Sequence, residues 1–250
     1  MIKQRFSVCI LLLLLALHGY NQSFKSPYKL SLNVDVPISS NAIGFFGASL
    51  LVGHSKTMPP KESLLTLDRK DVNRFDRGAT YQNNKGARYT SDAFMLLAIA
   101  TPLLHLINKD SRKDFGKVAA ISVETFMLNL AITNFVKENV RRKRPLMYNP
   151  DFPFEKKYKA DNFKSFFSGH TSTVAAMSFM YAKMYSDYNP NSKFKPLVWS
   201  LSAVFPVITG FLRFKGGKHY WTDVIVGYGV GALCGIAVPY LHSTALSYNR

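Results

Sequence analysis

The stretch VIVGYGVGALCGIAVPYL, residues 224–241, contains no charged side chain. Its length is close to the roughly 20 apolar residues that an α-helix needs to cross the hydrocarbon core of a bilayer. Glycine lets two helix backbones approach closely, and four glycines interrupt this stretch: Gly227, Gly229, Gly231 and Gly235. The stretch therefore predicts a membrane-spanning helix that packs tightly against another helix.

Four further apolar stretches precede it, at Ala93–Ile107, Val118–Val136, Thr171–Tyr185 and Leu197–Leu212. Their occasional polar residues would have to face the interior of a bundle if the helices lie in lipid. We therefore predict an all-α, membrane-embedded helical bundle of about five or six core helices. A soluble all-helical core with the same apolar stripes is the alternative.

The composition restricts the class of protein further. The chain has 250 residues, of which 47% are hydrophobic and 19% charged, and this excludes a disordered chain. A mean hydropathy of -0.02 excludes a transporter with many apolar spans. The net charge of +17 predicts anionic partners such as phosphorylated substrates, acidic lipid headgroups or nucleic acid. The 2 cysteines predict neither a disulfide framework nor a thiolate metal site.

Residues 1–19 have the features of an export signal. Lys3 and Arg5 precede the uncharged apolar run Val8–Leu17, which is too short to cross a bilayer comfortably. We expect either a cleaved signal peptide or an uncleaved anchor.

Residues 20–92 form the expected N-terminal extension, extracytoplasmic and with short helices, and residues 93–242 form the expected bundle domain. Pro37 is expected to break helical structure. Ile43–Val52 is apolar but short, so we expect an interfacial or packed helix rather than a span. The charged run Asp68–Arg77 is expected to form a solvated surface with a short helix.

Three short segments at the edges of the apolar stretches carry chemistry. The first is KENVRRKRP, from Lys137 to Pro145. Lys137 offers a point charge to an anion and Arg144 offers a planar fork that matches phosphate oxygens, while Pro145 is expected to end the preceding helix. Taken alone, the segment equally suits an anchor at the membrane surface.

The second segment is FSGHTS, residues 167–172. Gly169 lets the backbone approach a ligand, and free N–H groups at a helix start bind anions. Ser168 adds a hydroxyl donor, and His170 can give or take a proton near neutral pH. An ordinary helix cap with an incidental histidine is the alternative.

The third segment is RFKGGKHYWTD, residues 213–223. His219 and Asp223 are four residues apart and would share a face if the last helix begins there. An aspartate bonded to one imidazole nitrogen makes the other nitrogen more nucleophilic. Arg213 supplies a second phosphate fork, and the pair Gly216-Gly217 allows a tight turn. A capped helix with a local His–Asp pair is the alternative.

Together the segments resemble, in order and spacing, the motifs of the type 2 phosphatidic acid phosphatase superfamily. This superfamily includes bacterial class A acid phosphatases and vanadium haloperoxidases. Lys137 and Arg144-Pro145 match the first motif in full, but Phe167 replaces a proline in the second and Leu212 replaces a serine in the third. These departures affect flanking positions and leave every expected catalytic residue type in place.

The resemblance implies a metal-independent phosphatase that acts through a phosphohistidine. His219 would attack phosphorus, Asp223 would orient its imidazole, and His170 would protonate the leaving oxygen and then activate water. The non-bridging oxygens would be held by the other site residues, Lys137, Arg144, Ser168, Gly169 and Arg213. Neither a metal nor another cofactor is expected at this site, because fixed cations can neutralise the phosphate charge.

The implied substrate is a lipid phosphate such as phosphatidate, phosphatidylglycerol phosphate, undecaprenyl diphosphate or a lipid A phosphate, and membrane lipids are the other expected partners. The first alternative is a soluble exported acid phosphatase that acts on small esters. Two further alternatives are an enzyme that oxidises halides with bound vanadate and a membrane scaffold with an inactive site. A nucleic-acid partner is not expected, because no recognition signature accompanies the positive charge. The sequence does not set the oligomeric state.

The apolar stretches alternate in direction, so all three motifs are predicted on one side of the membrane. If Ile43–Val52 does not span, that side is the periplasm or the exterior, and the basic turn Asn108–Lys117 lies inside, as the positive-inside rule expects. If Ile43–Val52 does span, the motifs face the cytoplasm. We expect an integral protein of a bacterial-type cell envelope with an extracytoplasmic site.

Some ionisable groups have no assigned role. Four histidines lie outside the motifs and are expected to be structural or incidental: His18, His54, His105 and His242. Glu124 lies within an apolar stretch and is expected to bond inside the bundle, with support of the site from behind as the alternative.

Overall fold

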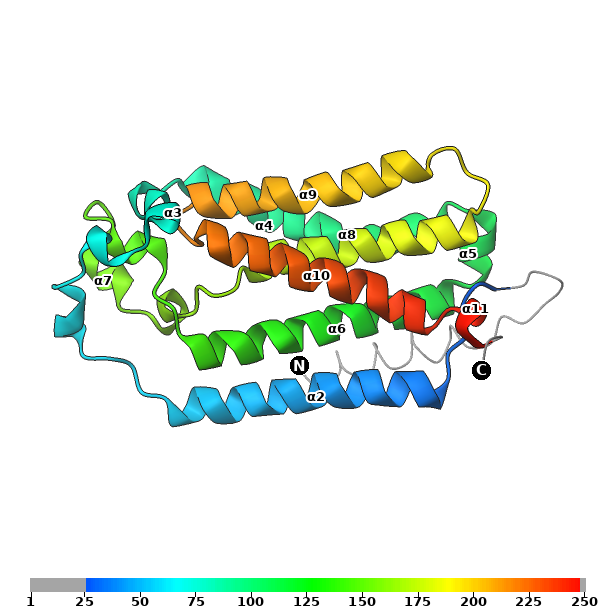
Figure 1. The fold of residues 1–250 in the computed structure, drawn as a ribbon, viewed down its shortest axis with the longest axis horizontal. Helices are drawn as coiled ribbons and strands as arrows, with labels where there is room; N and C mark the ends of the chain where they lie inside the picture. The colour runs from blue at the N-terminus through cyan, green and yellow to red at the C-terminus, as the bar shows by residue number, and fades with distance from the viewer. Residues whose placement is uncertain (1–25, 248–250) are drawn as a thin grey trace, which may run out of the picture.

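The computed structural model describes residues 26–247, which form a bundle of long helices with short helical connections (Figure 1). The long helices are α2 (Leu32–Ser55), α4 (Lys85–Ile99), α6 (Phe115–Val140), α8 (Gly169–Tyr188), α9 (Lys195–Lys215) and α10 (Trp221–Leu241). The described residues contain no strand, only an isolated bridge between Tyr28 and Ser243. The predicted all-α bundle is confirmed, while the predicted export signal at residues 1–19 lies outside the described residues.

The connections gather at the two ends of the bundle. One end, which we call the motif end, comprises residues 56–84, 141–168 and 216–220. It contains the short helices α3 (Arg74–Arg77) and α7 (Phe154–Lys157), with the 3₁₀ turns Lys61–Leu64, Arg69–Asp71, Gly78–Tyr81, Pro145–Tyr148 and Ala160–Phe163. The other, the far end, comprises residues 26–31, 107–114, 189–194 and 242–247, with α5 (Lys109–Lys113), α11 (Thr244–Ser247) and the adjoining turn Thr101–Leu106 (Figure 1).

Five of the described helical segments are long and apolar enough to cross a membrane. They are α2, α4 continued to Leu106, α6 continued to Tyr148, α9 and α10. Their outward side chains include exposed leucines and isoleucines such as Leu50, Ile225 and Leu233. Such faces are unfavourable in water but match lipid chains, so the protein is an integral membrane protein.

Helix α8 occupies the centre of the bundle. It packs against α4, α6, α9 and α10, and every residue from Thr171 to Met180 is buried. Its hydroxyl groups therefore face protein rather than lipid. Asn129 of α6, for example, accepts a hydrogen bond from the hydroxyl of Ser172 at 2.5 Å.

The glycines of α10 set its distance from α8. A Cβ atom added at Gly227, Gly231 or Gly235 would collide with a backbone oxygen of α8 or its cap. These glycines lie on one helix face because they are four residues apart. Gly229 faces open space and contributes nothing to this packing. Close packing of the last helix, predicted from its glycines, therefore rests on three of the four.

The prediction for Ile43–Val52 is wrong in its length. These residues lie inside α2, which runs for 24 residues and continues through Pro37. The first half of this helix contains several polar residues, so its sequence does not show a continuous apolar stretch. One of them, Asp35, is paired with His242 at the far end of the bundle, and a tertiary contact of this kind has no local signal in the sequence.

Two helix boundaries also differ from those predicted. Helix α6 ends at Val140, five residues before the proline, because Arg141 adopts a left-handed conformation with φ 48°. Pro145 instead begins a 3₁₀ turn. Helix α4 begins at Lys85 rather than Ala93, since its first two turns are polar and lie at the motif end.

Candidate active site

The first and third motifs meet at His219. This residue lies in the connection between α9 and α10 and is only 1% exposed. Its Nε2 atom lies 3.3 Å from Nη1 of Arg144, which is itself buried. A phosphate-binding cation and the candidate nucleophile, 75 residues apart in the chain, are therefore in contact.

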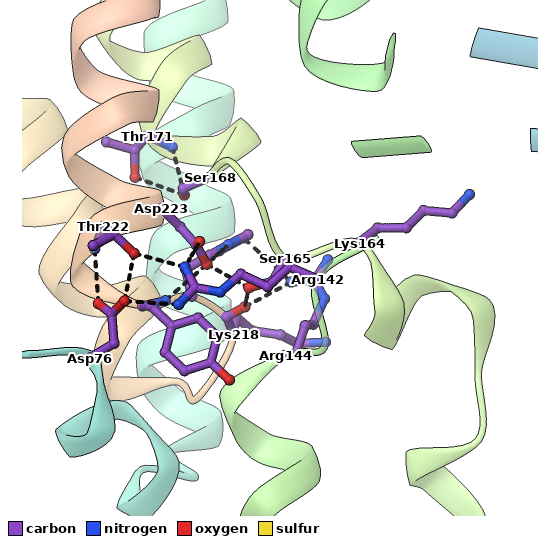
Figure 2. Close-up of polar contacts among 12 residues, drawn as sticks. Asp76, Arg142, Arg144, Lys164, Ser165, Ser168, Thr171, Lys218, Thr222 and Asp223 are labelled. Carbon is purple, nitrogen blue, oxygen red and sulfur yellow. Dashed lines mark hydrogen bonds and ion pairs between the residues drawn. The ribbon is translucent and has the colours of Figure 1, made fainter. Parts of the chain in front are cut away.

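The second motif joins the same cluster through its backbone. Ser168 caps α8, and its N–H group donates to the carbonyl of Asp223 at 3.0 Å. Its hydroxyl accepts a hydrogen bond from the N–H of Thr171 at 3.4 Å and lies 2.9 Å from the Thr171 hydroxyl (Figure 2). Gly169 faces Lys137, whose Cε atom would lie 3.6 Å from an added Cβ. The start of α8 is thus held against both other motifs.

His170 and Arg213 share a carboxylate that sequence reasoning missed. The Nε2 atom of His170 lies 2.7 Å from Oδ1 of Asp92, and Nη1 of Arg213 lies 3.2 Å from the same oxygen. Arg213 also donates to the hydroxyl of Ser91 at 3.1 Å, while its buried Nε has no hydrogen-bond partner among residues 26–247. Asp92 precedes the predicted stretch Ala93–Ile107 directly, so no pattern marked it.

A second missed residue, Arg142, links Asp223 to the N-terminal extension. Its guanidinium donates to Asp223 at 2.6 Å and to Asp76 at 2.8 Å (Figure 2). It also stacks on the ring of Tyr220. Asp76 is fully buried and also accepts hydrogen bonds from the N–H and hydroxyl of Thr222. The solvated surface with a short helix that was expected at Asp68–Arg77 is present over most of the run, but Asp76 is an exception because it is buried and paired with Arg142.

Asp223 is fixed mainly by groups other than His219. Its Oδ2 accepts hydrogen bonds from the Ser165 hydroxyl at 2.5 Å and from the Tyr220 N–H at 3.0 Å. His219 precedes α10, and its Nδ1 lies 3.4 Å from the same oxygen without forming a hydrogen bond. His219 and Asp223 are therefore adjacent, as the spacing predicted. However, His219 lies in the turn before α10 and not on the helix itself.

That turn depends on Gly217, which has φ 67°. This conformation is unfavourable for other residues, and an added Cβ would also collide with the carbonyl oxygen of Gln82. The tight turn expected from the glycine pair is therefore present.

The remaining contacts orient the cations. Arg144 donates from Nε to the carbonyl of Asp161 and from Nη2 to its carboxylate, both at 2.8 Å. Only Nη1 is directed at His219, and it also donates to the carbonyl of Lys218 at 3.2 Å. Lys137 donates to the carbonyl of Lys164 at 2.8 Å. Arg144 is thus held on one side and presents one nitrogen to the candidate nucleophile.

Positive charge dominates the cluster. Burial, and then the neighbouring Arg144 and Lys137, hold the pKa of His219 well below its usual value. Burial, and then Arg144, lower the pKa of Lys218 to about 8. Burial alone would raise the pKa of Asp161, but Arg144 and Lys218 outweigh it and lower that pKa. The imidazole of His219 is therefore neutral near pH 7, beside cations suited to an anion.

All eight residues predicted for the site lie in the motif end or in the helix turns that adjoin it. Direct contacts join Arg144 to His219 and Ser168 to Asp223, while Asp92 bridges His170 to Arg213. His170 and Arg213 also lie near enough to His219 to lower its pKa.

Comparisons with known proteins identify the family and the fold. The sequence profile of the PAP2 superfamily matches residues 118–247, more than half of the chain. One similar solved structure is described as the first transmembrane PAP2 type phosphatidylglycerolphosphate phosphatase from Bacillus subtilis. It has a TM-score of 0.50 and 18% sequence identity, over 84% of this chain and 96% of that one. No match was found among curated protein sequences. The chain belongs to the PAP2 superfamily.

Proposed function

We propose that this protein is a lipid phosphate phosphatase that works through a phosphohistidine on His219. The observation that carries the proposal is a buried, neutral imidazole in contact with Arg144, with further cations beside it. Phosphoryl transfer needs mainly positioning and stabilisation of charge, and this cluster supplies both.

In the first step, the Nε2 lone pair of His219 attacks phosphorus and the ester P–O bond breaks. The leaving oxygen takes a proton from His170 and departs as the lipid alcohol or, from a diphosphate, as the lipid monophosphate. Negative charge on the non-bridging oxygens is stabilised by three cations, Lys137, Arg144 and Arg213, with the Ser168 hydroxyl and the Gly169 N–H. A single donor of this kind contributes roughly 3 kcal/mol to catalysis in other enzymes.

In the second step, His170 takes a proton from water, and the water oxygen attacks the phosphohistidine. The P–N bond breaks, inorganic phosphate is released and His219 regains its lone pair. Asp223 faces Nδ1 of His219, so it favours the tautomer that keeps Nε2 free and stabilises the positive ring of the intermediate. We assign no metal to these steps.

A lipid substrate is favoured by the position of the cluster. It lies at the ends of α6, α8, α9 and α10, and several of these helices are apolar enough to cross the membrane. A headgroup can then reach the cations while its chains stay among the helices. The similar Bacillus subtilis structure, a phosphatidylglycerolphosphate phosphatase by its description, supports the same class of substrate.

The test is phosphate release by the purified protein in detergent, from long-chain phosphatidate, phosphatidylglycerol phosphate, undecaprenyl diphosphate and water-soluble esters. We expect release from at least one lipid at a higher kcat/KM than from any soluble ester, and an initial rate insensitive to chelator. Release from the soluble esters alone would identify an acid phosphatase instead. No release from any substrate would contradict the proposal.

We further propose that the motif end faces the periplasm or exterior. The short far-end turns carry exposed Lys109, Arg112 and Lys193, as expected of cytoplasmic turns. The segment Lys137–Lys164 at the motif end is also very basic, and we attribute its charge to binding of phosphate and lipid headgroups. Since α2 is long enough to span and begins at the far end, this orientation requires residue 26 to lie in the cytoplasm, and it replaces the expectation that residues 1–19 export the residues after them. An N-terminal signal that exports residue 26 would reverse it. Alkaline phosphatase fused after Tyr158 should be active and after Ser192 inactive, and the opposite pattern would place the site inside.

Substitution of Arg213 by lysine is expected to lower kcat/KM by about 10- to 100-fold. Lysine keeps the charge but loses the planar fork that can bind two phosphate oxygens. The measurement is steady-state kinetics on the best lipid substrate. Arg112→Lys, the same exchange at the far end, is the control, and wild-type kinetics in the Arg213→Lys protein would exclude this clamp.

Substitution of Asp92 by asparagine is expected to lower kcat by about 10-fold and to move the alkaline limb of the pH–rate profile to lower pH. A carboxylate 2.7 Å from His170 stabilises the protonated ring that donates to the leaving group. A neutral amide does not, so the ring loses its proton at a lower pH. A profile that keeps its shape would assign Asp92 to packing alone, and Asp110→Asn is the control.

A further inference from the structure

Three ionisable side chains meet at the far end of the bundle, away from the candidate active site. Asp35 comes from α2, Glu124 from α6 and His242 from the residue after α10. Nε2 of His242 lies 2.8 Å from Oδ1 of Asp35 and 3.1 Å from Oε2 of Glu124. Glu124 lies roughly 20 Å along α6 from Lys137 at 1.5 Å per residue, so it cannot support the catalytic cluster directly.

The contact made by Nδ1, the other ring nitrogen of His242, indicates that a positive charge lies between Nε2 and the two carboxylates. Nδ1 is 2.8 Å from the carbonyl oxygen of Val238. A carbonyl only accepts hydrogen bonds, so Nδ1 carries a proton, and a neutral ring would direct the Nε2 lone pair at two carboxylate oxygens. That arrangement is repulsive unless a positive charge, either a proton or a metal ion, lies between the three atoms.

The charge balance favours a metal ion. With a proton on Nε2 the buried group keeps a net charge of minus one, whereas a divalent cation makes it neutral. Within residues 26–247 neither Asp35 nor Glu124 pairs with a lysine or arginine, and Oε2 of Glu124 accepts no hydrogen bond. The side chain of His242 is 0% exposed and those of Glu124 and Asp35 are 13% and 27% exposed, so most of the group is shielded from water and uncompensated charge there is unfavourable.

The donor set also fits a metal. The three ligand atoms lie within 4.8 Å of one another. One imidazole nitrogen and two carboxylate oxygens are ligands that zinc accepts, and a water molecule would complete the four-coordinate geometry of a structural site. A metal-bound histidine normally donates its other N–H to a carbonyl or carboxylate. The contact between Nδ1 and Val238 has this form.

We propose that Asp35, Glu124 and His242 form a structural site for a divalent cation, zinc by its donor set, which ties α2 to α6 and α10. Helix α2 packs on the bundle chiefly through α6, and a cavity of about 350 Å³ lies between the two helices. Glu124 lines this cavity together with apolar side chains such as Ile38 and Met127. The two helices make few contacts across this cavity, and a metal ion at its edge would link them directly.

The test uses the full-length protein in detergent, stripped with chelator and then given zinc. We expect about one zinc per chain by elemental analysis and a rise of several degrees in Tm, since a ligand that binds only the folded state stabilises it. Glu124→Gln and His242→Gln should lose both effects, whereas His54→Ala, which removes an exposed histidine at the motif end, should keep them.

Phosphate release should persist in Glu124→Gln below its Tm, and this separates the metal site from the proposed reaction. Wild-type protein that binds no zinc, or Glu124→Gln protein that binds it equally well, would overturn the proposal. A Tm that follows pH but not zinc would do the same and would assign the central charge to a proton. If a variant fails to fold, the zinc content of the wild-type protein still decides.

Discussion

Alanine at position 219 is expected to lower phosphate release by about 10⁴-fold or more, because it removes the atom that forms the covalent intermediate. The fold should survive. Asp223 is held by Arg142, Ser165 and the Tyr220 N–H, none of which depends on the imidazole. The measurements are the single-turnover rate on the best lipid substrate and Tm in the same detergent.

Two further observations make this result decisive. Wild-type protein quenched during turnover of a ³²P-labelled substrate should carry an acid-labile label, and the His219→Ala protein should carry none. His54→Ala is the matched control and should behave as wild type. A folded His219→Ala protein that still releases phosphate at a comparable rate would remove His219 from the role of nucleophile.

Leucine at position 142 is expected to destabilise the protein by about 3 kcal/mol, because two buried carboxylates then lose their shared cation. Asp76 and Asp223 are each 0% exposed, while Arg142 is partly exposed, which keeps the loss at the lower end of the range for buried pairs. Activity should fall as well, since Asp223 faces His219. Chemical denaturation in detergent measures the first effect, and phosphate release measures the second.

The second carboxylate provides the control for this prediction. Asp76→Asn should be tolerated better in the Arg142→Leu background than in the wild type, because the amide removes one of the two unpaired charges. The double variant should therefore be more stable than Arg142→Leu alone. If it is less stable, Asp76 and Arg142 act independently and the shared-cation interpretation fails.

The sequence predicted the helices best where apolar residues are continuous. Residues 224–241 form almost the whole of α10 because every side chain there suits lipid or close packing. The prediction failed where a helix has a polar half, as in α2 and at the start of α4. In both places polar side chains are satisfied by groups distant in sequence, such as His242 for Asp35 and His170 for Asp92.

The candidate site shows the same division. His219, Asp223 and Arg144 could be predicted because their spacing within short segments is itself a pattern. Their supporting partners could not, since Asp76 and Asp92 lie far from the three motifs in the sequence and stand near many other charged residues. Burial distinguishes Asp76 from its neighbours, and burial at such a position is decided by tertiary structure.

The polarity of α8 affects how the chain enters the membrane during synthesis. This helix is not among the segments apolar enough to span alone, and its hydroxyl-rich surface is covered by α4, α6, α9 and α10. A nascent α8 leaving the translocon by itself would expose those groups to lipid tails. We therefore expect α8 to stay beside the earlier helices until α9 and α10 are made, so that these three helices enter the membrane together.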